Sequence, residues 1–341
     1  MTTVGSSNLT LPPLGLGTAP IGGLHADTSD DDSRAVLEQA WQEGIRYFDT
    51  APWYGNTQSE HRLGAFLRKQ PRDDFVVATK VGRLYRRPER DFDFEASAWR
   101  QRWPGGLPFV PHFDYSYDQI LRSYEDSLAR LGLNRVDALT IHDLDIRHQK
   151  TEEAIARGFE QLSEGGGFKA LEELKRSGEI RAIGAGINLP GYIPRFLERF
   201  DLDYFLLAMP YTLIGQEALA EELPLCQQRG ASVIIGAPFA SGILATGAVE
   251  GATYRYVAAP QQILDKVARI EAVCASFDVP LTAAALQFPL GHETVVSVIP
   301  GADGPAHVSA NVAATGHPIP AAFWSELKAQ GLIDPDAPVP S

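Results

Sequence analysis

Four ionisable side chains occur in short motifs that could together move a proton beside a carbonyl or hydroxyl group. Asp49 and Tyr54 lie in FDTAPWYG, Lys80 lies in TKVG, and His142 lies in IHD. An ammonium next to a phenol favours the phenolate and lowers the phenol pKa, and a carboxylate keeps a buried ammonium charged. An imidazole can orient the substrate oxygen or share its proton. This combination of groups suits hydride transfer, because a proton must move as the hydride moves.

Each of these residues also has an ordinary structural explanation when it is taken alone. Asp49 could cap a loop, Lys80 could be a solvated strand end, and His142 could be a hydrogen-bonded polar residue. Tyr54 could simply pack. Their joint occurrence at neighbouring strand ends favours a functional site, because active sites gather titratable groups with perturbed pKa values.

The elements that would position these residues alternate regularly along the chain. Eight short apolar runs are predicted as strands: Leu14–Thr18, Ile45–Phe48, Phe75–Thr79, Val136–Ile141, Ile180–Gly184, Tyr204–Ala208, Ser232–Gly236 and Val295–Ile299. Amphipathic helices are predicted between them, at Asp30–Glu43, Tyr115–Leu131, Ile155–Ser177, Gln216–Arg229 and Pro260–Ser276. Eight alternations predict a single (β/α)8 barrel of the TIM type, whose active site lies at the carboxyl ends of the strands.

Three segments fall outside this alternation. Val4–Leu11 is predicted to form a hairpin across the barrel floor, and Arg83–Tyr115 and Gly242–Pro260 are predicted to be long substrate loops. The Pro-rich stretch Asp334–Ser341 is predicted to be a loose tail of an otherwise single domain spanning residues 1–341.

The composition excludes several classes of partner. A net charge of −13 over 341 residues would repel nucleic acid and anionic membrane surfaces. The N-terminal residues lack the features of a signal peptide, and no apolar run reaches the roughly 20 residues of a membrane span, so we expect a cytoplasmic protein. Cys226 and Cys274 form no CxxC or Cys/His cluster, and no metal site is expected. We expect a monomer or small homo-oligomer that acts on a small molecule.

These motifs resemble those of the aldo-keto reductase superfamily. The resemblance rests on GIRYFDTAPWYGNTQSEHRLG, TKVG and IHD, and it extends from about Leu14 to Leu332. It implies that Tyr54 is the general acid/base, that Lys80 and Asp49 tune it, and that His142 orients the substrate.

Within the superfamily the chain is most similar to the bacterial L-fucose (D-threo-aldose) 1-dehydrogenases and pyridoxal 4-dehydrogenases. FDYSYDQILRSYEDSLARLGLNRVDAL and LTAAALQFPLGH are among the stretches that carry this likeness. It implies oxidation of a cyclic hemiacetal to a lactone. Pyridoxal oxidation, general carbonyl reduction and, more remotely, a non-catalytic nucleotide-binding regulatory subunit are the alternatives. Expected substrate contacts, besides Tyr54 and His142, are Trp53, Trp99 and Trp103.

The resemblance also implies a nicotinamide dinucleotide bound across the barrel mouth. The expected contacts are Thr18, Asn188, Tyr211, Pro238, Phe239, Ser241, Gly242, Leu244, Pro300, Gly301, Ala302, Asp303, His307 and Asn311. Ala208 and Gly236 replace the glutamine and stacking tyrosine of many relatives, and Tyr211 or Phe239 could compensate. Gly301 and His307 stand where NADP-preferring relatives have basic residues, and Asp303 adds negative charge, so we expect NAD to be preferred over NADP.

Overall fold

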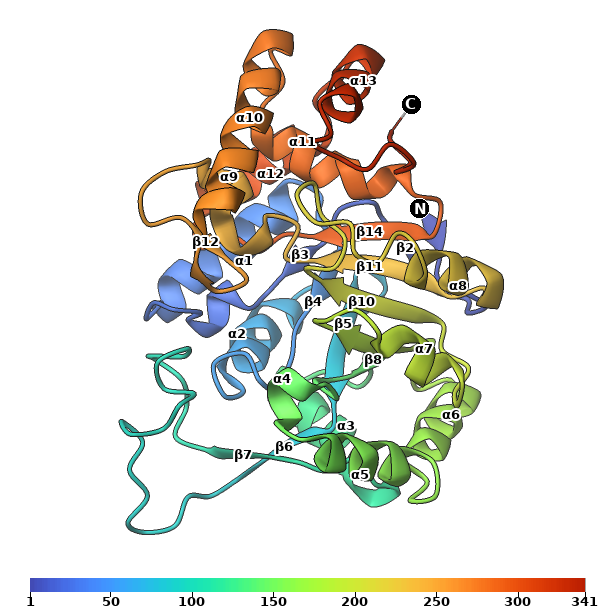
Figure 1. Cartoon of the computed structure of the whole chain (residues 1–341). Helices are drawn as coiled ribbons and strands as arrows, with labels where there is room; N and C mark the ends of the chain where they lie inside the picture. Colours follow the sequence, from blue (N-terminus) through green and yellow to red (C-terminus); the bar gives the residue numbers. More distant parts are fainter. Residues whose placement is uncertain (341) are drawn as a thin grey trace.

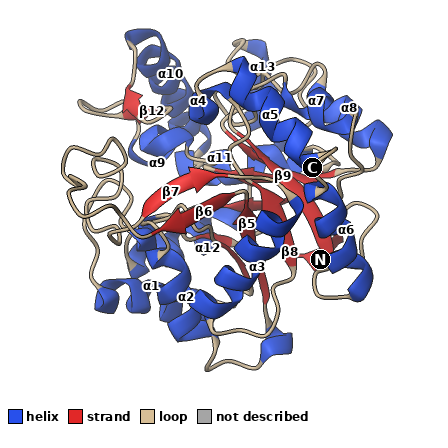
Figure 2. Ribbon diagram, turned by 90° about the horizontal axis from the view of Figure 1, so that it is seen from below, coloured by secondary structure: helices blue, strands red, loops and turns tan. Residues whose placement is uncertain are grey.

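The computed structural model describes residues 1–340 and contains a sheet of eight parallel strands surrounded by helices (Figures 1 and 2). The strand order is β14-β11-β10-β9-β8-β5-β4-β3. Parallel bridges from Leu14 to Val298 and from Gly17 to Gly301 join the first strand to the last. The predicted (β/α)8 barrel is therefore confirmed.

All eight predicted strands are present: three have the predicted bounds, and five have shifted ends. Their bounds are β3 Leu16–Gly17, β4 Tyr47–Asp49, β5 Val76–Val81, β8 Ala138–Ile141, β9 Ala182–Ile187, β10 Tyr204–Ala208, β11 Ser232–Gly236 and β14 Val295–Ile299. The largest shift is at β9, which continues past the predicted end at Gly184, through Gly186, to Ile187. The Tyr204 ring packs where a Cβ on Gly184 would lie. Glycines carry no strand signal in the sequence, so this end was placed too early.

The helices cover the outside of the barrel (Figure 2). Their bounds are α1 Asp30–Gln42, α2 Gln58–Leu67, α3 Tyr117–Leu131, α4 Ile146–Gln149, α5 Glu152–Leu162, α6 Gly167–Ser177, α7 Tyr192–Leu197, α8 Glu222–Arg229, α9 Ile243–Thr246, α10 Gln261–Phe277, α11 Leu281–Gln287, α12 Pro305–Thr315 and α13 Ala321–Ala329. Short 3-10 turns lie at η1 Pro20–Gly22, η2 Arg72–Asp74, η3 Ala240–Gly242 and η4 Phe288–Gly291.

Two of the predicted helices were wrong in extent. The single helix expected over Ile155–Ser177 is two helices, α5 and α6, because Gly166 turns the chain with a φ of +75°. Gly167 then lies so close to the Tyr115 carbonyl that a Cβ would be 1.8 Å from its oxygen. The helix expected from Gln216 begins only at Glu222, after a stretch of turns.

The amino-terminal hairpin closes the bottom of the barrel. β1 (Thr2–Thr3) pairs antiparallel with β2 (Thr10–Leu11). Val4, Leu9 and Leu11 are buried in one cluster with side chains inside the barrel, among them Tyr47 and Tyr204. Because apolar side chains fill this end of the barrel, a site with ionisable side chains is expected at the opposite end, where the strands have their carboxyl ends.

The two predicted loops contain hairpins of their own. In the first, β6 (Arg83–Arg86) pairs with β7 (Val110–Phe113), and the chain between them leaves the barrel body (Figure 1) and returns to its mouth, where Trp103 is buried. In the second, β12 (Thr253–Tyr254) pairs with β13 (Val257–Ala258).

The end of the chain is not the loose tail that we expected. Ala337 is fully buried, and Val339 packs so closely on Gly291 that a Cβ there would be 2.6 Å from its backbone. Ala337 thus belongs to the hydrophobic core and Val339 packs against it. Ser341 lies outside the described residues. Within residues 1–340 no single helix is long and apolar enough to cross a membrane, although the bent pair α10 and α11–η4 meets the length and composition test with a 103° bend.

Candidate active site

Asp49 and Lys80 form a buried ion pair at the carboxyl ends of β4 and β5. The Lys80 Nζ lies 2.5 Å from Asp49 Oδ1 and donates a second hydrogen bond, of 2.8 Å, to the Thr50 carbonyl. The strands are adjacent and in register, with Asp49 opposite Ala78. Both side chains are almost inaccessible to water, at 2% and 1% exposed. Their mutual attraction is therefore hardly screened.

Tyr54 and His142 lie beside this pair. The Lys80 Nζ is 4.9 Å from the centroid of the Tyr54 ring. The imidazole of His142 meets the Tyr54 ring edge-on, with ring centroids 6.2 Å apart. The His142 backbone is held by the Tyr115 hydroxyl, which donates to its carbonyl at 2.7 Å. The structure thus brings together all four residues that the motifs singled out.

The expected lowering of the Tyr54 pKa is not found. Burial raises the pKa of Tyr54 well above its ordinary value, and the charges of Asp49, Tyr256 and Asp143 raise it further. Because Lys80 is already paired with Asp49, its positive field at Tyr54 is largely cancelled. Burial likewise lowers the pKa of His142 well below its usual value. The site therefore holds a neutral phenol beside a neutral imidazole.

The His142 Nδ1 is buried without a hydrogen-bond partner among residues 1–340. An unpartnered buried nitrogen is unusual in a folded protein. His142 also lines the cavity at the barrel mouth. A substrate hydroxyl or carbonyl entering that cavity would find in this ring either a donor or an acceptor, according to its tautomer.

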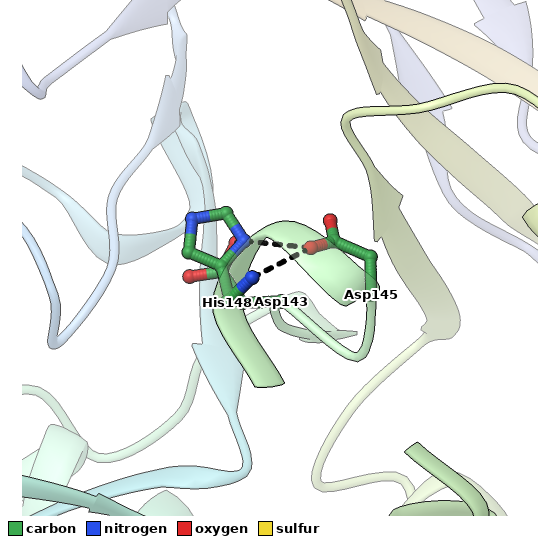
Figure 3. Close-up of side chains that lie close together, drawn as sticks. All are labelled: Asp143, Asp145 and His148. Atoms are coloured by element: carbon green, nitrogen blue, oxygen red, sulfur yellow. Dashed lines mark hydrogen bonds and ion pairs between the residues drawn. The ribbon is translucent and has the colours of Figure 1, made fainter. Parts of the chain in front are cut away.

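A second polar network follows His142 directly in the chain. Asp143, Asp145 and His148 offer ligand atoms within 4.8 Å of one another (Figure 3). The two carboxylates already have partners within the protein. Arg83 donates a hydrogen bond of 2.5 Å to Asp143, and His148 Nδ1 lies 2.9 Å from Asp145. Burial acts to raise the pKa of Asp143, but His142, His148 and Arg83 outweigh it and lower the pKa. These contacts describe a charge network whose acids already have hydrogen-bond donors.

The cavity of about 90 Å³ at the barrel mouth contains three of the four site residues, Tyr54, Lys80 and His142. Trp53 and Trp103 also line it, as predicted from the sequence. The Trp103 Nε1 is buried and has no partner among the described residues, so it can donate to a substrate oxygen. Trp99 does not line the cavity: its ring packs against Phe94, 6.0 Å between centroids, in the extended loop.

The predicted cofactor residues fall into groups with different surroundings. Asn188 lines the cavity, and its amide nitrogen donates to Asp143 and Asp145, which leaves its side-chain oxygen for a ligand amide. The Thr18 hydroxyl is fully buried and donates to the Asp49 carbonyl, so its role is to fix the strand end. Tyr211 is buried outside the cavity and packs on Phe288, so it does not supply a stacking ring.

The segment after β11 forms the start of the second loop. It includes Pro238, Phe239, Ser241, Gly242 and Leu244. The Leu244 side chain is fully buried, and the partly buried Phe239 packs against the core. The Ser241 hydroxyl accepts a hydrogen bond from the Tyr256 backbone nitrogen at 2.9 Å. This stretch thus anchors the β12–β13 hairpin over the cavity.

The segment after β14 leads into α12. At the start of this helix Pro305 has no N–H, and the N–H groups of His307 and Val308 donate to the Gly304 carbonyl, which leaves few backbone donors for a phosphate. Asp303 and His307 are paired there, and both are mostly exposed. Asn311 donates to the Gly301 carbonyl, which fixes the turn that also contains Pro300 and the buried Ala302. The role of this segment in binding a phosphate stays a prediction.

Several cavity residues were missed by the sequence reasoning, among them three with large polar side chains. Tyr256 stands at the tip of the β12–β13 hairpin, and Arg102 and Arg147 lie against its ring. Arg147 follows His142 by five positions, a nearness that could have drawn attention to it. No signal marks Tyr256 or Arg102, because their approach depends on how two long loops fold.

Comparisons with known proteins agree with this geometry. The model of the aldo/keto reductase family matches residues 13–331. Pyridoxal 4-dehydrogenase of Microbacterium luteolum is 42% identical over 335 residues, which cover 97% of each chain. D-threo-aldose 1-dehydrogenase of a Pseudomonas species is 39% identical over 96% of each chain. The holo form of an aldo-keto reductase from Bacillus halodurans superposes with a TM-score of 0.74 at 27% identity, over 100% of this chain and 97% of the other.

Proposed function

The chain belongs to the aldo/keto reductase family, and from this premise we propose that it oxidises the cyclic hemiacetal form of an aldose at C1 to the lactone, with NAD as the hydride acceptor. It is an NAD(P)-dependent oxidoreductase, as its family and its dehydrogenase relatives indicate. The observation that carries the proposal is the meeting of Tyr54, Lys80 and His142 in one cavity, with Lys80 paired to the buried Asp49.

The proposed roles follow from the surroundings of each group. The substrate hydroxyl at C1 lies between the Tyr54 phenol and the His142 imidazole, which hold its oxygen in place. Tyr54 as the phenolate accepts the hydroxyl proton in oxidation, and as the phenol it returns the proton in reduction. Because burial raises the pKa of Tyr54, its phenolate forms more readily as the pH rises, so oxidation becomes faster in alkaline solution. A bound nicotinamide supplies the carbon that takes up the hydride.

We propose that Asn188, the Pro238–Leu244 segment and the Pro300–Asn311 segment hold the dinucleotide. Gly186, which has no side chain, and Ala208, which has only a methyl group, line the same cavity as Asn188 and leave room for a flat ring. NAD is the proposed cofactor because Pro300–Asn311 has no Lys or Arg and contains an exposed Asp303. A carboxylate repels a 2′-phosphate and accepts a hydrogen bond from a free ribose hydroxyl. A kcat/KM that clearly favours NADP would contradict this part of the proposal.

Pyridoxal is the second candidate substrate. The 42% identity to a pyridoxal 4-dehydrogenase favours it. The Trp53 and Trp103 rings in the cavity wall, 5.8 Å apart between centroids, would also accept a flat pyridine ring. Pyridoxal forms an internal hemiacetal, so the chemistry at Tyr54 and His142 would be the same.

The test is the rate of NAD reduction with L-fucose, D-arabinose, L-galactose and pyridoxal, for the wild type and for Tyr54→Phe. We expect turnover with at least one aldose, and a loss of about 10²–10⁴-fold in kcat for the variant, the usual contribution of general acid–base catalysis. NAD binding, followed by fluorescence, should be retained. Turnover of pyridoxal alone would support the second candidate. A variant that keeps full activity would rule out the proposed role of Tyr54, and a wild type that binds NAD without turnover would indicate a regulatory subunit.

A further inference from the structure

Two arginine side chains in the cavity wall have no acidic partner within residues 1–340. Arg102 comes from the loop between β6 and β7, and Arg147 comes from α4. Within residues 1–340 neither guanidinium takes part in the ion pairs or side-chain hydrogen bonds of the structure; the neighbouring carboxylates are bound to Arg83 and His148 instead. Both guanidiniums are half-buried.

The cavity consequently has an excess of positive charge. Lys80 is matched by Asp49, and Arg83 is matched by Asp143. Asp145, which is in contact with His148, can balance at most one further positive charge. The two free guanidiniums therefore leave at least one positive charge without a counter-ion at the catalytic site. The chain as a whole has a net charge of −13, so the cavity differs from it in the sign of its charge. An unmatched positive charge favours the binding of an anion there.

Tyr256 holds the two like charges near each other. The guanidinium carbons of Arg102 and Arg147 lie 4.8 and 5.2 Å from the centroid of its ring. Arg255 and Tyr256 form the hairpin tip with φ values of +53° and +65°, a conformation that non-glycine residues seldom adopt. Burial lowers the pKa of Arg102, and the charge of Arg147 lowers it further. Backbone strain and like charges gathered at one point of an active site are typical of a ligand-binding device.

The position of this pair separates it from the segment proposed to bind the adenosine phosphate end of the dinucleotide. β8, which leads to Arg147, lies four strands from β14 in the eight-strand order and therefore on the opposite side of the barrel. The segment Pro300–Asn311, proposed to bind the adenosine phosphate end, follows β14. An anion bound by Arg102 and Arg147 would thus not be the phosphate at that end of the cofactor, and we assign it to the substrate.

We propose that Arg102 and Arg147 form a subsite for an anionic group, a carboxylate or a phosphate, at the end of an aldose substrate away from its reacting C1. The inference rests on the proposed function. A guanidinium presents a fork of donors that matches either oxyanion. Aldoses with a carboxylate or a phosphate at C6 can still close a hemiacetal ring, so C1 can react at Tyr54 while the anion lies against the two arginines.

The test compares matched pairs of charged and neutral sugars. D-galacturonate and D-galactose 6-phosphate are set against D-galactose, and the ratio of kcat/KM values is measured at saturating NAD. We expect the wild type to favour at least one anionic sugar about tenfold or more, and Arg102→Gln and Arg147→Gln each to lower that ratio about 10–100-fold, the usual range for a hydrogen bond to a charged group. The better of the two anions distinguishes a carboxylate subsite from a phosphate subsite. Arg102→Lys, which keeps the charge, should restore part of the ratio.

Arg100→Gln is the matched control, because Arg100 lies in the same loop but pairs with Glu95. It should leave the ratio unchanged. Calorimetric binding of D-galacturonate and D-galactose 6-phosphate to the enzyme–NADH complex gives a readout that does not depend on turnover, so the subsite can be tested even if aldose oxidation is not the reaction. Equal ratios in the wild type and both variants, the absence of anion binding, or variants that weaken NADH binding as much as sugar binding would each overturn the proposal.

Discussion

Replacement of Lys80 by methionine should strongly destabilise the protein, because it leaves a carboxylate buried without a counter-charge. The Asp49 side chain is 2% exposed, and Lys80 supplies its ion pair of 2.5 Å as well as a hydrogen bond to the Thr50 carbonyl. Exposed ion pairs contribute about 0–1 kcal/mol, but loss of one partner of a buried pair costs about 3–5 kcal/mol. The complete burial places Lys80→Met in the second range.

The assay is guanidinium-induced unfolding followed by circular dichroism at neutral pH. Asp49→Asn/Lys80→Met removes both charges and should be more stable than Lys80→Met by about 2 kcal/mol or more. Lys69→Met, at an exposed position, is the control and should change the free energy of unfolding by less than about 0.5 kcal/mol. If Lys80→Met cost less than about 1 kcal/mol, or if the effects of the two substitutions were additive, the two charges would not be coupled as the structure indicates.

Three further predictions follow from the same site and its supports. The phenolate absorbance that is lost in Tyr54→Phe should be absent from the free wild-type protein below about pH 10, because burial raises the Tyr54 pKa above its ordinary value; a Tyr54-dependent phenolate near neutral pH would contradict this. The pKa of His142 is lowered in the folded state, so the unfolded state binds more protons as the pH falls from about 7 to 5, and the folded state loses stability over that interval. His142→Gln should lose up to about 2 kcal/mol less of its free energy of unfolding than the wild type, measured by unfolding at each pH. Identical losses in the two proteins would refute this prediction. Gly64→Ala should cost about 1–3 kcal/mol in the same unfolding assay, because its Cβ would lie 2.2 Å from the Leu131 carbonyl oxygen between α2 and α3; a neutral effect would show that these helices can separate freely.

The sequence predicted those parts of the molecule that depend on local pattern. Parallel strands that are buried on both faces are recognisable as apolar runs, and the motifs at their ends placed Asp49, Lys80 and His142 correctly on adjacent strands. The break between α5 and α6 was missed, since it depends on how closely Gly167 approaches Tyr115. Periodicity alone carries no information about such a contact.

The parts of the site that come from long loops were harder to predict. Trp99 and Trp103 lie in the same predicted loop, and nothing in the sequence distinguishes them, yet of the two only Trp103 lines the cavity. The tuning of Tyr54 was also predicted with the wrong sign, because the pattern shows that a lysine is near but not that its charge is already matched by Asp49. Burial and pairing are properties of the folded chain, and they decide the pKa of each group.

The most direct test of the central claim is a single-turnover experiment with an aldose deuterated at C1, using L-fucose first. Enzyme saturated with NAD is mixed with the labelled sugar, and the cofactor is then analysed by mass spectrometry. The account predicts that the deuterium is transferred to the nicotinamide, with a rate that falls about 10²–10⁴-fold in Tyr54→Phe while NAD remains bound. Deuterium that stays on the sugar or is lost to water, or a transfer rate that does not change without the Tyr54 hydroxyl, would contradict it.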